Sequence, residues 1–313
     1  MIWLPPSEGK TPPTHGPVLD LAGLALPQLT AARREVAEAL IRVSASPQGA
    51  GILGVGPRSR DDLVTNVHLW DSPSAPAAQL YTGVLFEAAD LAGGAARGDV
   101  GHAPEPWIFS GLFGVLRPGD LVPDHRLPMG TRLPGPGGLA AYWRPHLEAA
   151  LRPVAENRVV VDLRSGPYRS ACPAPWAHTL RVDVVRDNDG RRTVVSHHAK
   201  HWRGLLCAQL SQDTGDVLAG SSGTDGVQAC VQRIRDLAPA MVTLDARGQS
   251  HHVTGIEASA TRTTSQGGSL TTLTLVTAQA GSATQAATLP SSTHRETRRT
   301  HPSAPVRTRR SAR

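Results

Sequence analysis

The sequence predicts a protein of the α+β class, and three segments carry that prediction. Residues 158–164 (RVVVDLR) are an apolar, β-branched run that is typical of a buried strand. Residues 180–185 and 192–195 predict a hairpin, because Asp187-Asn188-Asp189-Gly190 between them supplies turn residues. Residues 31–43 (AARREVAEALIRV) place apolar side chains among charges at the spacing of an amphipathic helix.

Further elements follow in chain order. Residues 1–4 (MIWL) predict a short buried strand, and together with residues 158–164 they are the best candidates for the centre of the sheet. Residues 80–92 predict a turn and a helix, and residues 139–155 predict a longer helix. Another helix is expected over residues 197–210 (HHAKHWRGLLCAQL).

The chain divides by composition into three regions. Residues 1–211 carry the predicted elements, and residues 212–256 are divergent. Residues 257–313 are rich in Thr, Ser, Ala, Gln and Gly and then become basic, so we expect a disordered, low-complexity tail. An out-of-frame reading of GC-rich DNA that begins after residue 204 would produce a similar composition, and both interpretations stay open here.

The positive charge is concentrated at the end of the chain. The formal net charge is +6, but the residues from His294 onward hold seven arginines and one acid, Glu296. Residues 1–293 are therefore formally neutral, and net charge alone does not identify a nucleic-acid-binding core.

Cysteine usage and hydropathy limit the class of protein. Cys172, Cys207 and Cys230 form no CxxC pair, which argues against a disulfide framework and a zinc ribbon. No apolar run approaches the roughly 20 residues that span a bilayer, and the first residues lack the apolar core of a signal peptide. We therefore expect a cytoplasmic protein with no membrane partner.

Lysine is almost absent from this chain. Of 32 basic residues only Lys10 and Lys200 are lysines, in a composition that is typical of a GC-rich genome. A compact ammonium that can lose its proton is chemistry that a guanidinium cannot supply. Both lysines are therefore candidate functional residues, and the alternative is that they are chance survivors on a solvated surface.

A glycine pair follows the first long helix. Gly54-Val55-Gly56 and the helices expected on either side resemble a helix-hairpin-helix unit over about residues 31–66. Amides at such a turn bind DNA phosphates without reading sequence, and Arg58 and Arg60 would lie beside the phosphate. A tight turn between two packed helices explains the same pattern equally well.

Five motifs resemble the YaaA family of peroxide-stress proteins. They are SEGKT (7–11), YTG (81–83), SGLFGVLRPGDLVPDHRLPMGTRL (110–133), VVDLRSGPY (160–168) and SHHAKHWRG (196–204), in the family's order and with similar spacing. The resemblance covers about residues 1–210. It implies a single α+β domain with a mixed sheet, surrounding helices and a helix-hairpin-helix element. It also implies a cytoplasmic protein of the peroxide response that binds DNA and limits iron-driven Fenton damage.

The resemblance assigns both lysines to motif positions, so we expect Lys10 and Lys200 to lie together. The long middle motif resembles the rim of a polar cleft, and the predicted cleft residues are Ser7, Lys10, Arg117, Asp120, His125, Arg126 and Lys200. Arg117 and Arg126 suit a bidentate phosphate or carboxylate partner. For Arg117, a structural pair with Asp120 is the better interpretation.

The chain departs from the family pattern at several positions. His125 stands where the family usually has tyrosine, and Arg164-Ser165 stands where it has Ala-Ser. His197 and His201 share a helix face and with a carboxylate could hold a metal. Solvated or packed histidines are the simpler interpretation, so we expect no metal and no cofactor.

A second class of function stays open, an enzyme that acts on a nucleotide or a nucleic-acid base. In that interpretation Lys10, Arg126 and Lys200 line the cleft, Asp162 is a candidate acid or base, and the partner is a small phosphate-bearing ligand. Convergence of both lysines on one cavity favours an enzyme. An open basic groove beside the glycine hairpin favours DNA binding.

Overall fold

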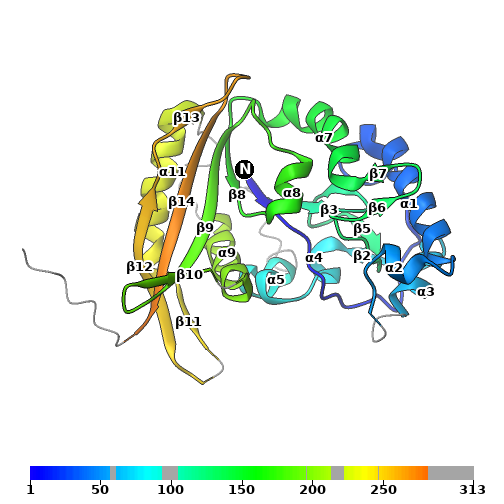
Figure 1. Ribbon diagram of the computed structural model, residues 1–313, viewed down its shortest axis with the longest axis horizontal. Coiled ribbons are helices and arrows are strands. Elements are labelled where there is room, and N and C mark those ends of the chain that lie inside the picture. Colours follow the sequence, from blue (N-terminus) through cyan, green and yellow to red (C-terminus); the bar gives the residue numbers. More distant parts are fainter. Residues whose placement is uncertain (57–60, 94–104, 195, 213–221, 246, 281–313) are drawn as a thin grey trace, which may run out of the picture. The chain divides into compact units, whose positions relative to one another are not determined.

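The computed structural model describes residues 1–56, 61–93, 105–194, 196–212, 222–245 and 247–280. By its contacts the chain divides into residues 1–282 and residues 283–313, and the helices and strands named here belong to the first unit. Helices and a large mixed sheet make up this unit, as Figure 1 shows. None of the helices in the described ranges is long and apolar enough to cross a membrane.

The centre of the sheet is parallel. Strand β1 (Ile2–Leu4) lies between β3 (Trp107–Ser110) and β8 (Val159–Asp162) and runs parallel to both. Strand β9 (His178–Asn188) follows β8, and β14 (Ser269–Gln279) follows β9, again in parallel. Every residue of β1 and β8 is buried, which is typical of parallel strands covered on both faces. The prediction that residues 1–4 and 158–164 form the centre is confirmed.

Antiparallel strands extend the sheet. On one side β4 (Gly114–Leu116) pairs with β3, and on the other β12 (Ser250–Ala258) pairs with β14. Strand β11 (Val242–Leu244) pairs with β12, and β13 (Arg262–Thr263) pairs with β14. Strand β10 (Arg191–Thr193) pairs antiparallel with β9, which confirms the predicted hairpin.

Two small sheets lie apart from the large one. The first pairs β2 (Ser74–Pro76) with β5 (Leu121–Pro123), and the second pairs β6 (Arg132–Leu133) with β7 (Gly137–Gly138). Each of these sheets takes one strand, β5 or β6, from the long middle motif. The motif therefore has an ordered backbone despite its glycines and prolines.

The three long predicted helices are confirmed as α1 (Thr30–Ser44), α7 (Leu139–Ala155) and α9 (Ser196–Ser211). Residues 77–89 form α4 (Ala77–Leu80) and α5 (Val84–Ala89), and α5 packs against α9 (Figure 1). The described ranges also hold the helices η1 (Pro27–Leu29), α2 (Gly49–Ile52), α3 (Asp61–Val67), α8 (Gly166–Ala171), α11 (Gly223–Leu237) and η3 (Ala238–Ala240). Helix α11 packs against strands β8, β9 and β14.

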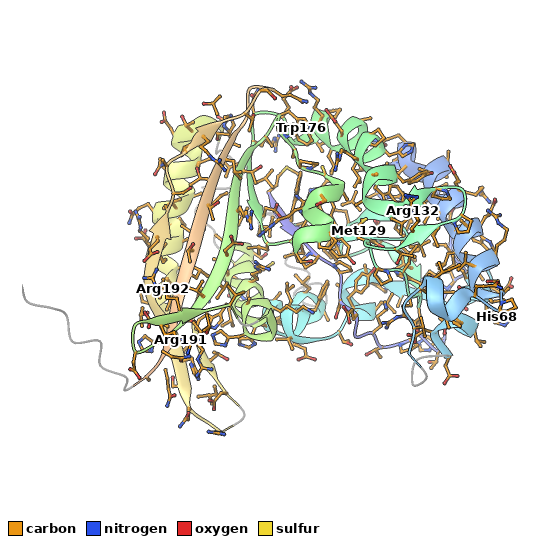
Figure 2. All side chains as sticks on the ribbon, viewed as in Figure 1. His68, Met129, Arg132, Trp176, Arg191 and Arg192 are labelled. Carbon is orange, nitrogen blue, oxygen red and sulfur yellow. The ribbon has the colours of Figure 1, made fainter. Side chains whose placement is uncertain are left out.

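Large aromatic side chains fill the core. Trp3, Trp143, Trp176 and Trp202 are all fully buried. Trp176 is buried, whereas Arg191 is exposed on the β9–β10 hairpin; both are labelled in Figure 2. Through these side chains, strand β1 and helices α7 and α9 share one hydrophobic core.

The predicted disorder of residues 257–313 is wrong for residues 257–280. Strand β14 (SLTTLTLVTAQ) lies between β9 and β12, and its side chains Leu273 and Leu275 are fully buried. The threonines between the leucines lower the apolar content, and the partner strand β9 is distant in the sequence, so no local pattern revealed the strand. Residues 281–313 lie outside the described residues.

Candidate functional site

The loop after β1 is fixed against the segment before α5. The backbone of residues 9–11 pairs with residues 80–82 through two hydrogen bonds of 2.9 and 3.0 Å. The Ser7 hydroxyl donates a further short hydrogen bond to a carbonyl oxygen of the same segment. Because of this pairing, Lys10 stands opposite Tyr81.

A tight turn supplies the next wall of the site. The Ser110 hydroxyl oxygen accepts hydrogen bonds of 3.2 Å from the N–H groups two and three residues later. A Cβ atom on Gly111 would lie 2.1 Å from the Leu127 carbonyl oxygen, so only glycine lets the turn approach residues 127–128 this closely. Gly111 of the middle motif therefore serves a close backbone contact.

A cavity of about 100 Å³ lies between these segments, and we name it the two-lysine cavity. Its basic lining residues are Lys10, Arg126 and Lys200. The other polar side chains that line it are Ser7, Glu8, Tyr81, Ser110, His125, Ser165 and Tyr168. Both lysines of the chain thus meet at one cavity, together with three more of the predicted cleft residues, Ser7, His125 and Arg126.

Two of these cations lie close to carboxylates. The Lys10 Nζ atom is 4.0 Å from an Asp124 carboxylate oxygen, and an Arg126 guanidinium nitrogen is 3.2 Å from an Asp62 oxygen. Burial lowers the pKa of Lys10, and the nearby Asp124 charge opposes that shift. Beyond them lies a second cavity of about 310 Å³, whose acidic lining residues are Glu8, Asp62 and Asp124. Lys10 and Arg126 line both cavities, whereas Asp62 and Asp124 line only the second.

His125 is a buried, neutral histidine. Burial and then the Lys10 charge lower its pKa from 6.5 to about 3. Its Nδ1 lies 2.9 Å from the Pro123 carbonyl oxygen, which can only accept, so Nδ1 carries the proton. Nε2 is then an acceptor, 3.3 Å from the Tyr81 hydroxyl, and burial raises the pKa of that phenol. The pair forms a neutral, hydrogen-bonding wall of the cavity.

Helix α9 positions Lys200 through a close contact with α5. A Cβ atom on Gly204 would lie 2.3 Å from the Leu85 carbonyl oxygen and 2.7 Å from the Ala88 side chain. Only glycine allows the two helices to approach so closely. Residues four apart share a helix face, so the same contact brings Lys200 to the cavity.

Two predicted cleft residues do not line this cavity. The Arg117 guanidinium lies 3.7 Å from the centre of the Trp107 ring and pairs with Glu105 at 3.3 Å. The Asp120 carboxylate accepts hydrogen bonds from the backbone N–H of Arg117 at 2.9 Å and of Ala25 at 3.1 Å. Their placement in the cleft was wrong. The expected association of Arg117 with Asp120 exists as a carboxylate cap on a backbone amide and not as a pair of side-chain charges.

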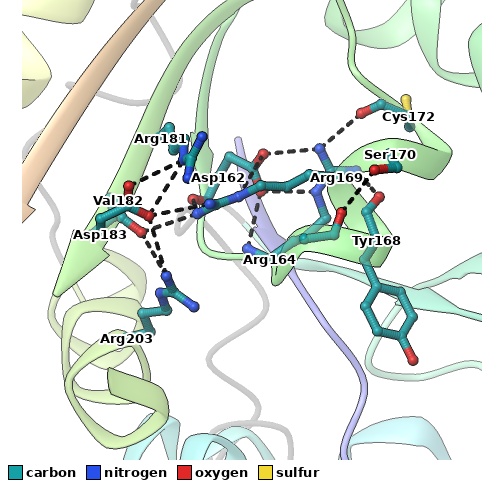
Figure 3. A network of polar contacts seen from close by, with 11 residues as sticks. Asp162, Arg164, Tyr168, Arg169, Ser170, Cys172, Arg181, Val182, Asp183 and Arg203 are labelled. Carbon is teal, nitrogen blue, oxygen red and sulfur yellow. Dashed lines mark hydrogen bonds and ion pairs between the residues drawn. The ribbon is translucent and has the colours of Figure 1, made fainter. Parts of the chain in front are cut away.

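Asp162, the candidate acid or base, is held in a structural network (Figure 3). Its carboxylate accepts two hydrogen bonds from the Arg164 guanidinium, at 2.8 and 3.0 Å, and one from the Arg164 backbone N–H at 3.0 Å, and it lies 3.7 Å from Arg169. Burial acts to raise the pKa of Asp162, but the two arginines outweigh it and hold the pKa below its usual range. The Arg164 guanidinium also lies over the rings of Trp3 and Phe109. This arginine-paired carboxylate does not line the two-lysine cavity, so the expected placement of Asp162 in the cleft was wrong.

The glycine pair ends helix α2. Gly54 has φ of +63°, and the N–H groups of Gly54 and Val55 donate to carbonyl oxygens of the preceding turn at 3.4 and 2.8 Å. This is the Schellman arrangement that closes a helix C-terminus, so these two amides are already used. Arg58 and Arg60 lie outside the described residues. A hairpin that binds phosphate through Gly56 and these arginines stays a prediction.

His197 and His201 were weighed as metal ligands, and cysteines are the residue type that could react with peroxide. In the described part of the chain, no three His, Cys, Asp or Glu side chains gather into a metal site. The side chain of His197 is outside that part. Cys172, Cys207 and Cys230 are all buried, and burial raises the pKa of Cys172 to about 11 and of Cys207 to about 12. A thiol that reacts with peroxide needs exposure and a low pKa, so these cysteines are not suited to that reaction.

Several residues of the site were not predicted from the sequence. Tyr81, Ser165 and Tyr168 line the two-lysine cavity, and Asp124 pairs with Lys10. Tyr81 lies in the YTG motif, and Ser165 and Tyr168 lie in VVDLRSGPY. Their positions in these motifs indicated a role. The sequence did not show that the motifs meet at one cavity.

Comparison with known proteins places the chain among similar sequences. The family described as "Peroxide stress protein YaaA" matches residues 1–219. A UPF0246 protein of Streptomyces coelicolor is 35% identical over 240 residues, which cover 76% of this chain and 90% of that protein. A UPF0246 protein of Corynebacterium efficiens is 40% identical over 218 residues, which cover 67% of this chain and 84% of that protein. An alignment over 76% of the chain extends past residue 204, which argues against an out-of-frame origin for the segment that directly follows.

Proposed function

The chain belongs to the family of the peroxide stress protein YaaA, and on this premise we propose that it acts by binding a phosphate-bearing group of nucleic acid in the two-lysine cavity. One observation carries the proposal. Lys10, Arg126 and Lys200 come from three distant segments and line a single cavity. Hydroxyl groups beside them add neutral donors, and cations with hydroxyl donors are the groups that contact phosphate oxygens.

The electrostatics of Lys10 support an anionic ligand. Burial lowers the pKa of this lysine, and the Asp124 carboxylate is 4.0 Å away, at the limit of an ion pair. A phosphate in the cavity would favour the charged ammonium and raise the pKa again. Ligand binding and protonation of Lys10 would therefore reinforce each other.

In the cell we propose that the partner is cytoplasmic DNA and that binding limits the damage which iron-driven Fenton chemistry causes there. Gly56, Arg58 and Arg60 would add contacts that do not depend on base sequence. The buried cysteines support protection of a target and not direct reduction of peroxide by thiols.

A second candidate is an enzyme that acts on a nucleotide or a nucleic-acid base. The observation that favours it is the meeting of both lysines at one cavity, where a protonated Tyr81 backed by a neutral His125 forms part of the wall. A lysine with a lowered pKa is suited to proton transfer near neutral pH. Turnover of nucleotides or oligonucleotides, followed by mass spectrometry of the products, separates this candidate from binding alone.

The test replaces each cavity lysine by arginine. Lys10→Arg and Lys200→Arg keep the charge and change the shape of the cation, so we expect both variants to stay folded and to lose peroxide protection and DNA retardation. Arg191→Lys, on the exposed β10 strand, is the matched control and should behave as wild type. The DNA assays use chains without residues 283–313, because the arginines of that segment would bind DNA nonspecifically.

Near-normal protection in both lysine variants contradicts a shaped site. It would assign the lysines a general electrostatic role, which arginine can fill.

A further inference from the structure

A cluster of arginines surrounds Asp183 (Figure 3), and two of the elements that supply it, α8 and α9, also supply lining residues of the two-lysine cavity. Strand β9 places Arg181 and Asp183 on one face, because side chains two residues apart in a strand point the same way. Helix α8 contributes Arg169, and helix α9 contributes Arg203. Arg169 directly follows Tyr168, a lining residue of the cavity.

All three guanidinium groups pair with the same carboxylate. Nitrogen atoms of Arg169 and Arg203 lie 3.2 and 3.5 Å from one oxygen of Asp183, and the Arg181 Nε atom lies 3.2 Å from the other. Arg169 and Arg203 also donate hydrogen bonds to the Val182 carbonyl oxygen, at 3.1 and 3.0 Å. The three side chains are therefore held in fixed positions around Asp183.

The charges of this cluster do not balance. Counted together, Arg164, Arg169, Arg181 and Arg203 face only the two carboxylates of Asp162 and Asp183, since Arg169 pairs with both of them. Burial, and then repulsion from Arg169, lower the pKa of Arg203 to about 10. The Arg203 Nε atom is buried and has no hydrogen-bond partner among the described residues. Excess positive charge in such a place is unfavourable until an anion compensates it.

The cluster is accessible from one side. The side chains of Arg169 and Arg203 are 15% and 13% exposed, whereas Arg181 is 44% exposed and Asp183 is 33% exposed. An anion can therefore reach the guanidinium groups from the side of Arg181. Guanidinium forks match the oxygen spacing of a phosphate group and bind it through paired hydrogen bonds.

We propose that Arg169, Arg181 and Arg203 form a second anion site, which binds a phosphate group beside the two-lysine cavity. The site goes beyond the proposed function and does not depend on it, because neither lysine belongs to the cluster. The phosphate can come from free pyrophosphate or from the backbone of a nucleic acid. Lys200 and Arg203 lie three residues apart on α9, so a polyanion that fills both sites would cross that helix.

The experiment measures two affinities by isothermal titration calorimetry, for inorganic pyrophosphate and for a single-stranded oligonucleotide. It compares the chain of residues 1–282 with its variants Arg181→Gln, Lys10→Arg and the control Arg191→Gln, because the arginines after residue 282 would bind the oligonucleotide nonspecifically. Arg181 is the most exposed member of the cluster, so its replacement leaves Arg169 and Arg203 to pair with Asp183. We expect Arg181→Gln to weaken at least one of the two affinities about tenfold or more, and Arg191→Gln to change neither.

The pattern of losses identifies the source of the phosphate. A loss for pyrophosphate with Lys10→Arg unchanged supports a separate site for free phosphate, whether or not the proposed function holds. A loss for the oligonucleotide alone supports a backbone contact.

Wild-type affinities for both ligands in Arg181→Gln overturn the arginine site, as does the absence of binding by the wild type. A loss in Lys10→Arg alone supports the two-lysine cavity and overturns the arginine site. Urea unfolding checks that each variant is folded.

Discussion

Position 125 shows how burial sets the chemistry of one side chain. The His125 ring packs against the Phe113 and Tyr81 rings, with centres 5.0 and 6.1 Å apart, and its pKa is lowered from 6.5 to about 3. Above pH 6.5 the ring is neutral in the folded and the unfolded chain. Below that pH the unfolded chain binds a proton that the folded chain does not bind until about pH 3. Acid therefore favours the unfolded state.

We expect the free energy of unfolding to fall by about 2 kcal/mol between pH 7 and pH 5 because of His125 alone. The measurement is urea unfolding at the two pH values. The comparison variant, His125→Gln, has no titrating group at this position, so its stability should depend less on pH. An equal fall in both proteins would assign the acid sensitivity to other groups.

At the scale of elements, the contact between α5 and α9 determines where Lys200 lies. We expect Gly204→Ala to lower the free energy of unfolding by about 1–3 kcal/mol, because the new methyl group meets the Leu85 backbone. The shifted helix should also weaken ligand binding that depends on Lys200. Urea unfolding and oligonucleotide titration measure the two effects.

Gly51→Ala in α2 is the matched control. Gly51 is also a helical glycine, but a Cβ atom there meets no neighbour within 4 Å. Its replacement should leave stability unchanged or raise it by up to about 1 kcal/mol, through the better helix propensity of alanine. Equal destabilisation by both replacements would mean that the α5–α9 contact has no special role.

At the scale of the molecule, strand β14 joins strands β11 and β12 to the rest of the large sheet. It pairs in parallel with β9 over residues 269–277 and antiparallel with β12. A chain that ends at residue 260 loses this strand and exposes one edge of β9. We expect it to lose cooperative unfolding, as measured by circular dichroism during urea titration.

The control chain ends at residue 282, the boundary of the first unit. It keeps β14, so its unfolding should match that of the full chain. Normal unfolding of the shorter chain would show that β14 is dispensable for the sheet.

Local periodicity was enough for the elements whose apolar pattern lies within one segment. Helix α1 and strand β8 were predictable because their apolar residues follow the helix period or form a continuous β-branched run. The two lysines were also identifiable, because arginine has replaced lysine everywhere else in the chain. The placement of Arg117, Asp120 and Asp162 failed, because a charged residue in a motif can serve the fold or the site equally well. Their partners Glu105, Ala25 and Arg164 decide which.

What the sequence by itself determined is therefore the helices and strands with strong local patterns and the residue types suited to bind an anion. The tertiary structure alone decided that β14 enters the sheet, that Lys10 and Lys200 line one cavity, and that three arginines share one carboxylate. The physical reason is that strand pairing and cavity formation join residues far apart in the chain. Their free energy comes from contacts that form only when the whole sheet is assembled, and no local pattern records them.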